Sequence, residues 1–435
     1  MTTENLSPRW KTWQKIIFRV LFLFLLYFTI DYLFFTFAIA LPINFKSGVD
    51  LVEHLSILHK PLYWLDAHLY HIGYNPKKNV VGGPDAAFGI VLYISIFITC
   101  LLAGAIWSWL DRKRPSYNKL NYWFRVYLRY AVAIVMLGYG MDKLIPVQMA
   151  YPNAYTLLGR FGDQSLFNVL WNFLGASPGY EIFTGICEIT GSLLLLFRRS
   201  SVFGCLLMCT ILTNVVALNI FYNVSVKIFS SLLLVCILFL LAPFFQRLVQ
   251  LFFYEQKVSL AEKYYHFQSG TTRRLLNLSG ALLIALLILG NISSNFKRYR
   301  KSVEGRGQIY EVTSFVTKDT LQANITDTLN WKRFVLMAGR SDTTNYAIIY
   351  YNNINNEYEH GDWYYYSKDT IKKTFTIRDI SGAIIHHYSF TYNPETKGGL
   401  SFTGNFKGYD VKINMKPVMD SMYLNKEKIK WVQDY

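Results

Sequence analysis

The sequence predicts a helical membrane bundle of about seven spans, followed by a mainly β, antiparallel domain that is a barrel or a sandwich. Hydrophobic residues make up 52% of the 435 residues and charged residues only 17%, whereas a soluble globular chain carries about 25% charged residues. Long apolar runs follow one another up to about residue 294. From about residue 302 the chain changes to short segments rich in Tyr, Phe, Ile, Val and Thr, with turn residues between them.

The apolar runs are the predicted membrane spans, because a crossing helix needs about 20 predominantly apolar residues. The first run follows a basic N-terminus and is longer than the core of about 7–15 residues in a signal peptide. No small-residue cleavage site follows it, so we expect a retained anchor helix. Seven segments qualify, at 16–41, 86–110, 122–144, 180–197, 201–222, 226–245 and 275–294.

The charged loops predict the orientation of these spans in the cell (inner) membrane. The formal net charge is +16, and the basic residues gather between the apolar runs. The N-terminus, the loop "DRKRPSYNK", the turn after the fourth span and the loop after the sixth all fall on one side if the spans alternate. The positive-inside rule makes that side cytoplasmic, so the N-terminus is expected inside and the C-terminal domain outside the cytoplasm. The run "KRYRK" (297–301) lies on the outer side, and one miscounted span would place the C-terminal part in the cytoplasm.

Several kinds of site find no support in the sequence. All five cysteines lie in apolar runs, so no disulfide framework and no CxxC redox motif is expected. Four histidines in the first outer loop (His54, His59, His68 and His71) are too loosely spaced for the three or four convergent ligands of a zinc site, and no metal is predicted. No nucleotide-binding, nucleophile-elbow or HExxH motif occurs.

The C-terminal third predicts about eight antiparallel strands. The turns between them carry Gly, Asn and Pro, for example "NNINNE" and "NPETKGG". The predicted strand segments are "QIYEVTSFV", "KRFVLMA", "YAIIYY", "DWYYYS", "KTFTIRD", "AIIHHYSFTY", "LSFTG" and "YDVKINM".

Polar side chains inside the apolar runs form the candidate site, because such groups are costly in a membrane and face the protein interior. Glu188 lies well inside the fourth span, where a carboxylate must be neutral or matched by a cation. Lys143 and Arg129 in the third span are the available cations. The predicted intramembrane polar cluster comprises Arg129, Asp142, Lys143, Glu181, Thr184, Glu188, Asn214 and Asn219.

Two interpretations of this cluster stay open: a structural ion pair that sets the helix register, or a proton or ligand site. Asp142 and Glu181 are expected near the outer face. Gly185 and Gly191 would let a neighbouring helix pack closely. The two asparagines of the fifth span are expected to bridge helices by hydrogen bonds or to line the same cavity.

The third and fourth spans share a residue pattern with a known family. The third span has an Arg and ends on Gly and Lys, and the fourth has a Glu, then a Gly, an apolar run and a short basic turn. The matching residues are Arg129, Gly138 or Gly140, Lys143, Glu188, Gly191, "LLLLF" and Arg198–Arg199. This pattern resembles that of the DoxX-like family of integral membrane proteins.

The resemblance implies a four-helix bundle over residues 122–245, which is under a third of the chain. Some family members are linked to quinone or sulfur redox chemistry, and longer relatives add N-terminal spans and a C-terminal β domain with an aromatic, charged tail such as "EKIKWVQDY". The predicted domains are a two-span region with an outer-face loop (1–121), the DoxX-like bundle (122–245), a cytoplasmic loop with the last span (246–301) and an outward-facing β domain (302–435).

Three functions remain as hypotheses. The first is a non-enzymatic envelope or complex-assembly component, in which the bundle anchors an outward β domain that binds a protein partner. The second is a membrane oxidoreductase subunit linked to quinone or sulfur redox chemistry, which the lack of an outward cysteine pair makes less favourable. The third is a small-molecule or proton-coupled transporter that uses Glu188. The expected partners are the lipid bilayer and a protein, not nucleic acid; the pattern names no cofactor and no catalytic residue.

Overall fold

The computed structural model describes residues 9–40, 56–76, 85–260, 270–317, 329–338, 345–351, 361–380, 386–395 and 398–419. The chain divides into two compact units. The helical unit comprises Met1–Gln148 and Gly179–Lys297, and the barrel unit comprises Met149–Pro178 and Arg298–Tyr435. The barrel unit therefore includes the segment 149–178, which lies between α5 (Asn118–Leu144) and α8 (Pro178–Leu196) of the helical unit in the sequence. The predicted domain limits assign this segment to the four-helix bundle.

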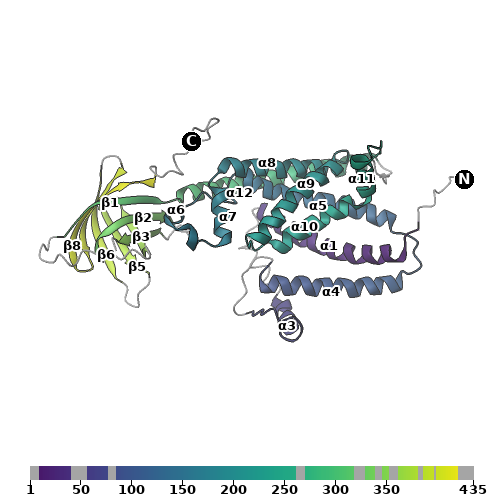
Figure 1. Ribbon diagram of the computed structural model, residues 1–435, viewed down its shortest axis with the longest axis horizontal. Helices are drawn as coiled ribbons and strands as arrows, with labels where there is room; N and C mark the ends of the chain where they lie inside the picture. Colours follow the sequence, from purple (N-terminus) through teal and green to yellow (C-terminus); the bar gives the residue numbers. More distant parts are fainter. Residues whose placement is uncertain are drawn as a thin grey trace. The chain divides into compact units, whose positions relative to one another are not determined.

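The helical unit is built from long apolar helices (Figure 1). Its described elements are α1 (Thr12–Ala40), α3 (Ser56–Leu65), the π-helix η1 (Asp66–Tyr70), α4 (Ala87–Leu110), α5 (Asn118–Leu144), α8 (Pro178–Leu196), α9 (Ser201–Phe221), α10 (Lys227–Leu241), the 3-10 helix η3 (Ala242–Phe244), α11 (Phe245–Phe253) and α12 (Gly270–Glu304), whose last residues belong to the barrel unit.

Five helices among the described residues are long and apolar enough to cross a membrane. They bury only 22% to 44% of their most apolar stretches inside the protein, so much of their apolar surface faces outward, as lipid contact requires. The predicted third and seventh spans lie on α5 and α12, which are not among the five, so the number of seven stays a prediction. The five are Thr12–Leu33, Ala87–Leu110, Pro178–Leu196, Ser201–Phe221 and Lys227–Phe253.

The core of the helical unit lies between α1, α5, α9 and α10. Leu128 of α5, Met208 of α9 and Cys236 of α10 are fully buried there beside Leu25 and Phe28 of α1. The buried positions of α5 recur at helical spacing, which keeps one face of that helix in the core. The ends of α5 are thereby fixed against its neighbours, and this places the ionisable residues described below.

The C-terminal part is a closed antiparallel barrel of eight strands, which decides between barrel and sandwich (Figure 1). It confirms the predicted strand segments within the described residues; residues 383–385 of "AIIHHYSFTY" lie outside them. Consecutive strands pair, and β8 returns to β1 with Phe315 opposite Ile413. The strands are β1 (Gln308–Thr317), β2 (Trp331–Ala338), β3 (Asn345–Tyr351), β4 (Asp362–Asp369), β5 (Thr374–Asp379), β6 (His387–Pro394), β7 (Leu400–Phe406) and β8 (Tyr409–Pro417).

Aromatic side chains fill the barrel interior. Trp331 stacks on Phe334 at 5.4 Å between ring centroids, and Phe375 stacks on Phe402 at 4.8 Å. All four side chains are almost completely buried. An eight-stranded barrel is just wide enough for its own side chains, so this barrel has a packed core.

The inserted segment covers part of the outer surface of the barrel. It forms α6 (Ala154–Leu158), the 3-10 helix η2 (Phe161–Asp163) and α7 (Leu166–Gly175) (Figure 1). Ala154 is fully buried in one cluster with Ile309 and Ile348, and its backbone N–H donates to the Arg306 carbonyl at 2.8 Å. Strand β3 is therefore buried on both faces, which explains why "YAIIYY" is continuously apolar.

Candidate functional site

Two glycines bring the backbones of α5 and α8 together. A Cβ atom on Gly185 would lie 2.8 Å from the Gly140 carbonyl oxygen and 2.9 Å from the Cβ of Lys143. Both distances are too short for a real side chain, so the close approach requires glycine at position 185. This contact places the last turn of α5, which carries Lys143, against the middle of α8.

Lys143 and Glu188 form a buried ion pair across this contact. The Lys143 Nζ donates to Glu188 Oε1 at 2.5 Å. The two residues are only 7% and 2% exposed. The other carboxylate oxygen, Oε2, is buried and has no hydrogen-bond partner in the described part of the chain. The pair therefore joins α5 to α8 and leaves one acceptor at its centre unused.

The structure selects Lys143 over Arg129 as the cation for Glu188. On α5 the two cations lie about four turns apart, which is about 21 Å along the helix axis. Arg129 instead lines a small cavity of about 20 Å³ together with Arg125. Arg125 donates to the Leu240 carbonyl at 2.7 Å, so this end of α5 is held to α10.

The remaining predicted members on these helices are Asp142 on α5 and Glu181 and Thr184 on α8. Asp142 is half-buried, and its carbonyl accepts from the N–H of Val147 where α5 ends. Glu181 is buried in the first turn of α8, about two turns from Glu188. The Thr184 hydroxyl donates to the Glu181 carbonyl at 2.8 Å within the same helix.

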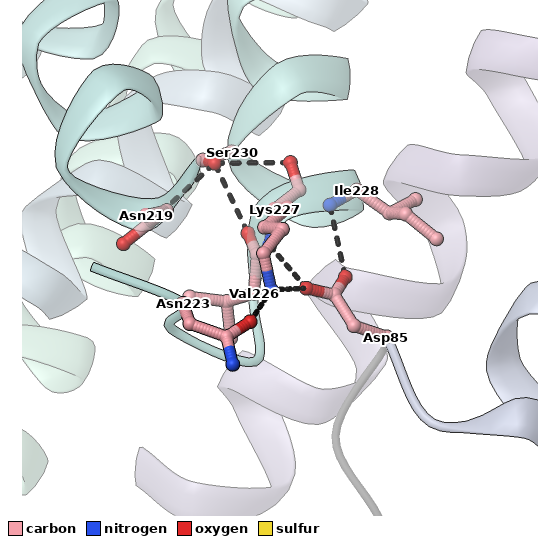
Figure 2. Close-up of polar contacts among 7 residues, drawn as sticks. All are labelled: Asp85, Asn219, Asn223, Val226, Lys227, Ile228 and Ser230. Atoms are coloured by element: carbon pink, nitrogen blue, oxygen red, sulfur yellow. Dashed lines mark hydrogen bonds and ion pairs between the residues drawn. The ribbon is translucent and has the colours of Figure 1, made fainter. Parts of the chain in front are cut away.

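The two asparagines of α9 have different environments. Asn214 is exposed on the surface of the helical unit, so the structure does not place it in the buried cluster. Asn219 is buried, and its Nδ2 donates to the Ser230 hydroxyl of α10 at 3.0 Å. Asn219 therefore bridges two helices, as predicted (Figure 2).

The N-terminus of α10, close to Ser230, has a helix cap that the sequence does not predict. Asp85 lies before α4, yet its carboxylate accepts from the backbone N–H groups of Lys227 and Ile228, at 2.7 and 3.0 Å. The Nζ of Lys227 lies 3.6 Å from the same carboxylate (Figure 2). A carboxylate at a helix N-terminus satisfies free N–H groups and the positive end of the helix dipole. Asp85 therefore fixes where α10 starts.

A second missed cluster surrounds Arg19 of α1, which is buried inside an apolar run. Its guanidinium donates to the Ser108 hydroxyl, the Asp111 carbonyl and the Tyr117 hydroxyl at 2.6 to 3.0 Å. The Tyr117 hydroxyl donates to Asp111 at 2.7 Å, and this bond, with the charges of Arg114 and Arg19, holds the pKa of that carboxyl below its usual range. A lone basic residue within "IIFRVLF" was the available signal. The cluster ties α1 to the turn after α4.

The histidine-rich first loop contains a backbone turn built by Asp66. Its buried carboxylate accepts from the N–H groups of Ile72, Gly73 and Tyr74 at 2.6 to 3.0 Å. His59 contacts the Tyr74 hydroxyl, and His68 of η1 contacts the Trp64 carbonyl of α3. His54 lies outside the described residues. Among the residues that the structure describes, no three potential metal ligands gather at one point.

Comparison with known proteins gives no family assignment. No family model and no solved structure matches the chain. The chain is similar to the uncharacterized protein YwoB of Bacillus subtilis (strain 168), with 32% identity over 100 residues, or 21% of this chain. The chain spans 65% of the length of that relative.

Proposed function

We propose that the chain is a non-enzymatic membrane protein of the cell envelope, in which the helical unit anchors an outward-facing barrel unit that binds a partner. The packed barrel interior is the observation that carries this proposal. Because Trp331, Phe375 and Phe402 fill the space inside, the barrel offers its outer surface for recognition. Segment 149–178 builds part of that surface.

The connections between the two units support an anchoring role. The chain passes from one unit to the other after Gln148, after Pro178 and after Lys297. The barrel unit is therefore connected to the helical unit at three points along the chain. The basic loops of the helical unit support an outward barrel by the positive-inside rule.

We further propose that α5, α8, α9 and α10 form a DoxX-like four-helix core. The ion pair supports this, since Lys143 and Glu188 are the two residues that the resemblance singles out at the end of one helix and within the next. In this core the pair acts as a fixed cross-link between α5 and α8.

Labelling of single cysteines in intact spheroplasts tests the orientation. Ile371 lies in the turn after β4 and is 93% exposed, so Ile371→Cys offers a reactive thiol on the barrel. Lys113→Cys, in the exposed loop after α4, is the matched control for the opposite side. A membrane-impermeant maleimide should label Ile371→Cys at once and Lys113→Cys only after lysis, above the background of the parent protein. The reverse pattern would overturn the outward placement.

Purification of the full chain in mild detergent, followed by native mass spectrometry, tests the non-enzymatic part. Copurified proteins that are lost when the barrel surface is altered would support a binding role. Copurified quinone or flavin at stoichiometric amount would instead favour the oxidoreductase alternative.

Proton-coupled transport is a second candidate, favoured by one observation. Glu188 Oε2 is buried without a hydrogen-bond partner among the described residues, and carboxylates inside membrane helices occur in the proton relays of transporters. Proton flux into vesicles that is lost in Glu188→Gln and retained in Glu181→Gln would support this candidate. Equal flux in both variants and in the parent would exclude Glu188 as the carrier.

A further inference from the structure

A cavity of about 310 Å³ opens on the outer face of the barrel, within the barrel unit. One wall is the inserted segment from α6 to α7, and the other is formed by strands β3 and β4. Its volume is in the range of about 300–1,000 Å³ that small-molecule sites occupy. Neither the packed barrel core nor the ion pair in the helical unit contributes to it.

Aromatic rings form one side of this cavity. Trp363 of β4 and Tyr155 of α6 remain 36% and 46% exposed, although their ring centroids are only 5.2 Å apart. Tyr346 also packs against Trp363 in an edge contact, with the ring centroids 5.9 Å apart. The two partly exposed rings come from different elements and give the cavity an apolar aromatic surface.

Amide side chains also line the cavity. Gln164, Asn168 and Asn172 line the cavity, and Asn172 Nδ2 donates to Gln164 Oε1 at 3.4 Å. Each amide offers both donors and an acceptor. The two charged lining residues, Arg160 and Asp163, have opposite signs, so the wall carries no net formal charge.

We propose that this cavity binds an oligosaccharide. A sugar ring has an apolar C–H face, which packs on an aromatic ring, and a rim of hydroxyl groups, each of which is both donor and acceptor. Aromatic platforms and amides meet both requirements, whereas a phosphate-bearing ligand needs a net positive wall. The assignment rests on the proposed function, whose partner it identifies as a glycan.

Two sources present this chemistry, a free oligosaccharide and the headgroup of a glycolipid. Binding is measured by isothermal titration calorimetry on the purified full chain in a zwitterionic detergent, because a detergent with a sugar headgroup would compete. The free probes are maltotetraose, cellotetraose and chitotetraose. The lipid probe is digalactosyldiacylglycerol in mixed micelles, compared with diacylglycerol.

Trp363→Ala and Asn168→Ala should each weaken binding at least tenfold. Asn168 uses only its backbone N–H in the cap of α7, so its side chain can be removed without loss of that cap. Tyr365→Ala and Phe173→Ala are matched controls, because these residues lie on the same strand and helix but not at the cavity. The controls should keep parental affinity, and the melting temperature of each variant checks its fold.

Saturable binding of any probe that the two cavity variants lose and the controls keep would support the proposal, and the arm that binds identifies the source. No binding of any probe, or binding that the Asn168→Ala variant retains, would overturn it. Since the measurement uses purified protein, it does not depend on membrane orientation. An inward-facing barrel in the labelling experiment would therefore contradict the proposed function without affecting this result.

Discussion

Glu188 lies inside a membrane helix, where an ionised carboxylate needs a cation as its partner. An unpaired ionised residue at the centre of a membrane helix costs about 2.5–3.5 kcal/mol or more. Lys143 offsets that cost through one contact of 2.5 Å, from the last turn of α5, where a cation is also favoured by the helix dipole. The position of the pair thus follows from two separate requirements, the charge balance of α8 and the C-terminus of α5.

We predict that Glu188→Gln lowers the free energy of unfolding of the detergent-solubilised protein by about 3–5 kcal/mol. The reason is that Lys143 is left buried without a compensating charge. Lys143→Met should do the same from the other side. The double variant should cost clearly less than the sum, because it leaves no unpaired charge. Arg129→Met is the control, since its effect should add to that of Glu188→Gln. Additive effects in the Lys143 cycle would contradict the pair.

The sequence predicts that Glu188 has a cationic partner, but not which cation it is. A glutamate inside an apolar run requires a cation, and the third span offered two. The helical rise separates Arg129 from Lys143 by about 21 Å, so only one of them can meet Glu188. Choosing Lys143 required knowing that Gly140 faces Gly185, a contact between helices that no pattern within one helix encodes.

At the level of elements, the close packing of α5 against α8 requires a residue without a side chain at position 185. The hypothetical Cβ of Gly185 lies within 3.0 Å of the backbone of Gly140 and Leu144. Gly191, which was also expected to assist helix packing, instead lies against Met208 of α9. Gly185 and Gly191 therefore contact two different neighbouring helices.

We predict that Gly185→Ala separates α5 from α8 and costs about 1–3 kcal/mol through overpacking. The matched control is Gly179→Ala in the same helix, where a Cβ meets nothing within 4 Å. The control should keep or slightly raise the melting temperature, which tryptophan fluorescence in detergent measures. Equal effects of the two substitutions would show that the close approach is not required.

Helix α10 is capped from a distant part of the chain. Asp85 is 142 residues away from the N–H group that it accepts from. A cap is predictable from sequence when the capping residue lies within a few residues of the helix. Asp85 is far from α10 in the sequence, so no local pattern predicts this cap.

We predict that Asp85→Ala destabilises the protein by about 0.5–2 kcal/mol, the usual cost of losing an N-cap. Asp85→Asn should lie between the parent and Asp85→Ala, because one acceptor remains. Lys227→Met separates the cap from the ion pair, since it removes the partly exposed Nζ and keeps the backbone N–H. If Lys227→Met costs as much as Asp85→Ala, the ion pair and not the cap is the stabilising contact.

At the scale of the whole molecule, local patterns predict the strands but not their closure. Short segments rich in Tyr, Phe, Ile and Val, separated by turns with Gly and Asn, predict the positions of all eight strands. Whether they form a barrel or a sandwich depends on the pairing of β1 with β8, which lie at opposite ends of the domain. The cover of β3 by α6 was not predicted, because the strand pattern of "YAIIYY" contains no information on which other segment packs against it.

This cover leads to a prediction about the limits of the barrel domain. Residues 298–435 alone should show strand-type circular dichroism and a cooperative melt, because the aromatic core lies entirely within them. The outer cluster of Ile309, Val335 and Ile348 would then face water, since its cover comes from Ala154 and its neighbours in α6. Burial of a Val or Ile side chain is worth about 1.5–3 kcal/mol. We therefore expect the fragment to melt at a lower temperature than a fusion of residues 149–178, a Gly-Ser linker and residues 298–435.

Ala154→Asp in the fusion supplies the control. It places a carboxylate in a fully buried position and should lower the melting temperature of the fusion to that of the bare fragment. Ser165→Ala changes the same segment at the cap of α7, away from the cluster, and should leave most of the gain. Differential scanning fluorimetry of the four proteins decides the matter. If fragment and fusion melt together, α6 contributes nothing to the barrel, and the domain begins at the end of α12 as the strand pattern alone suggests.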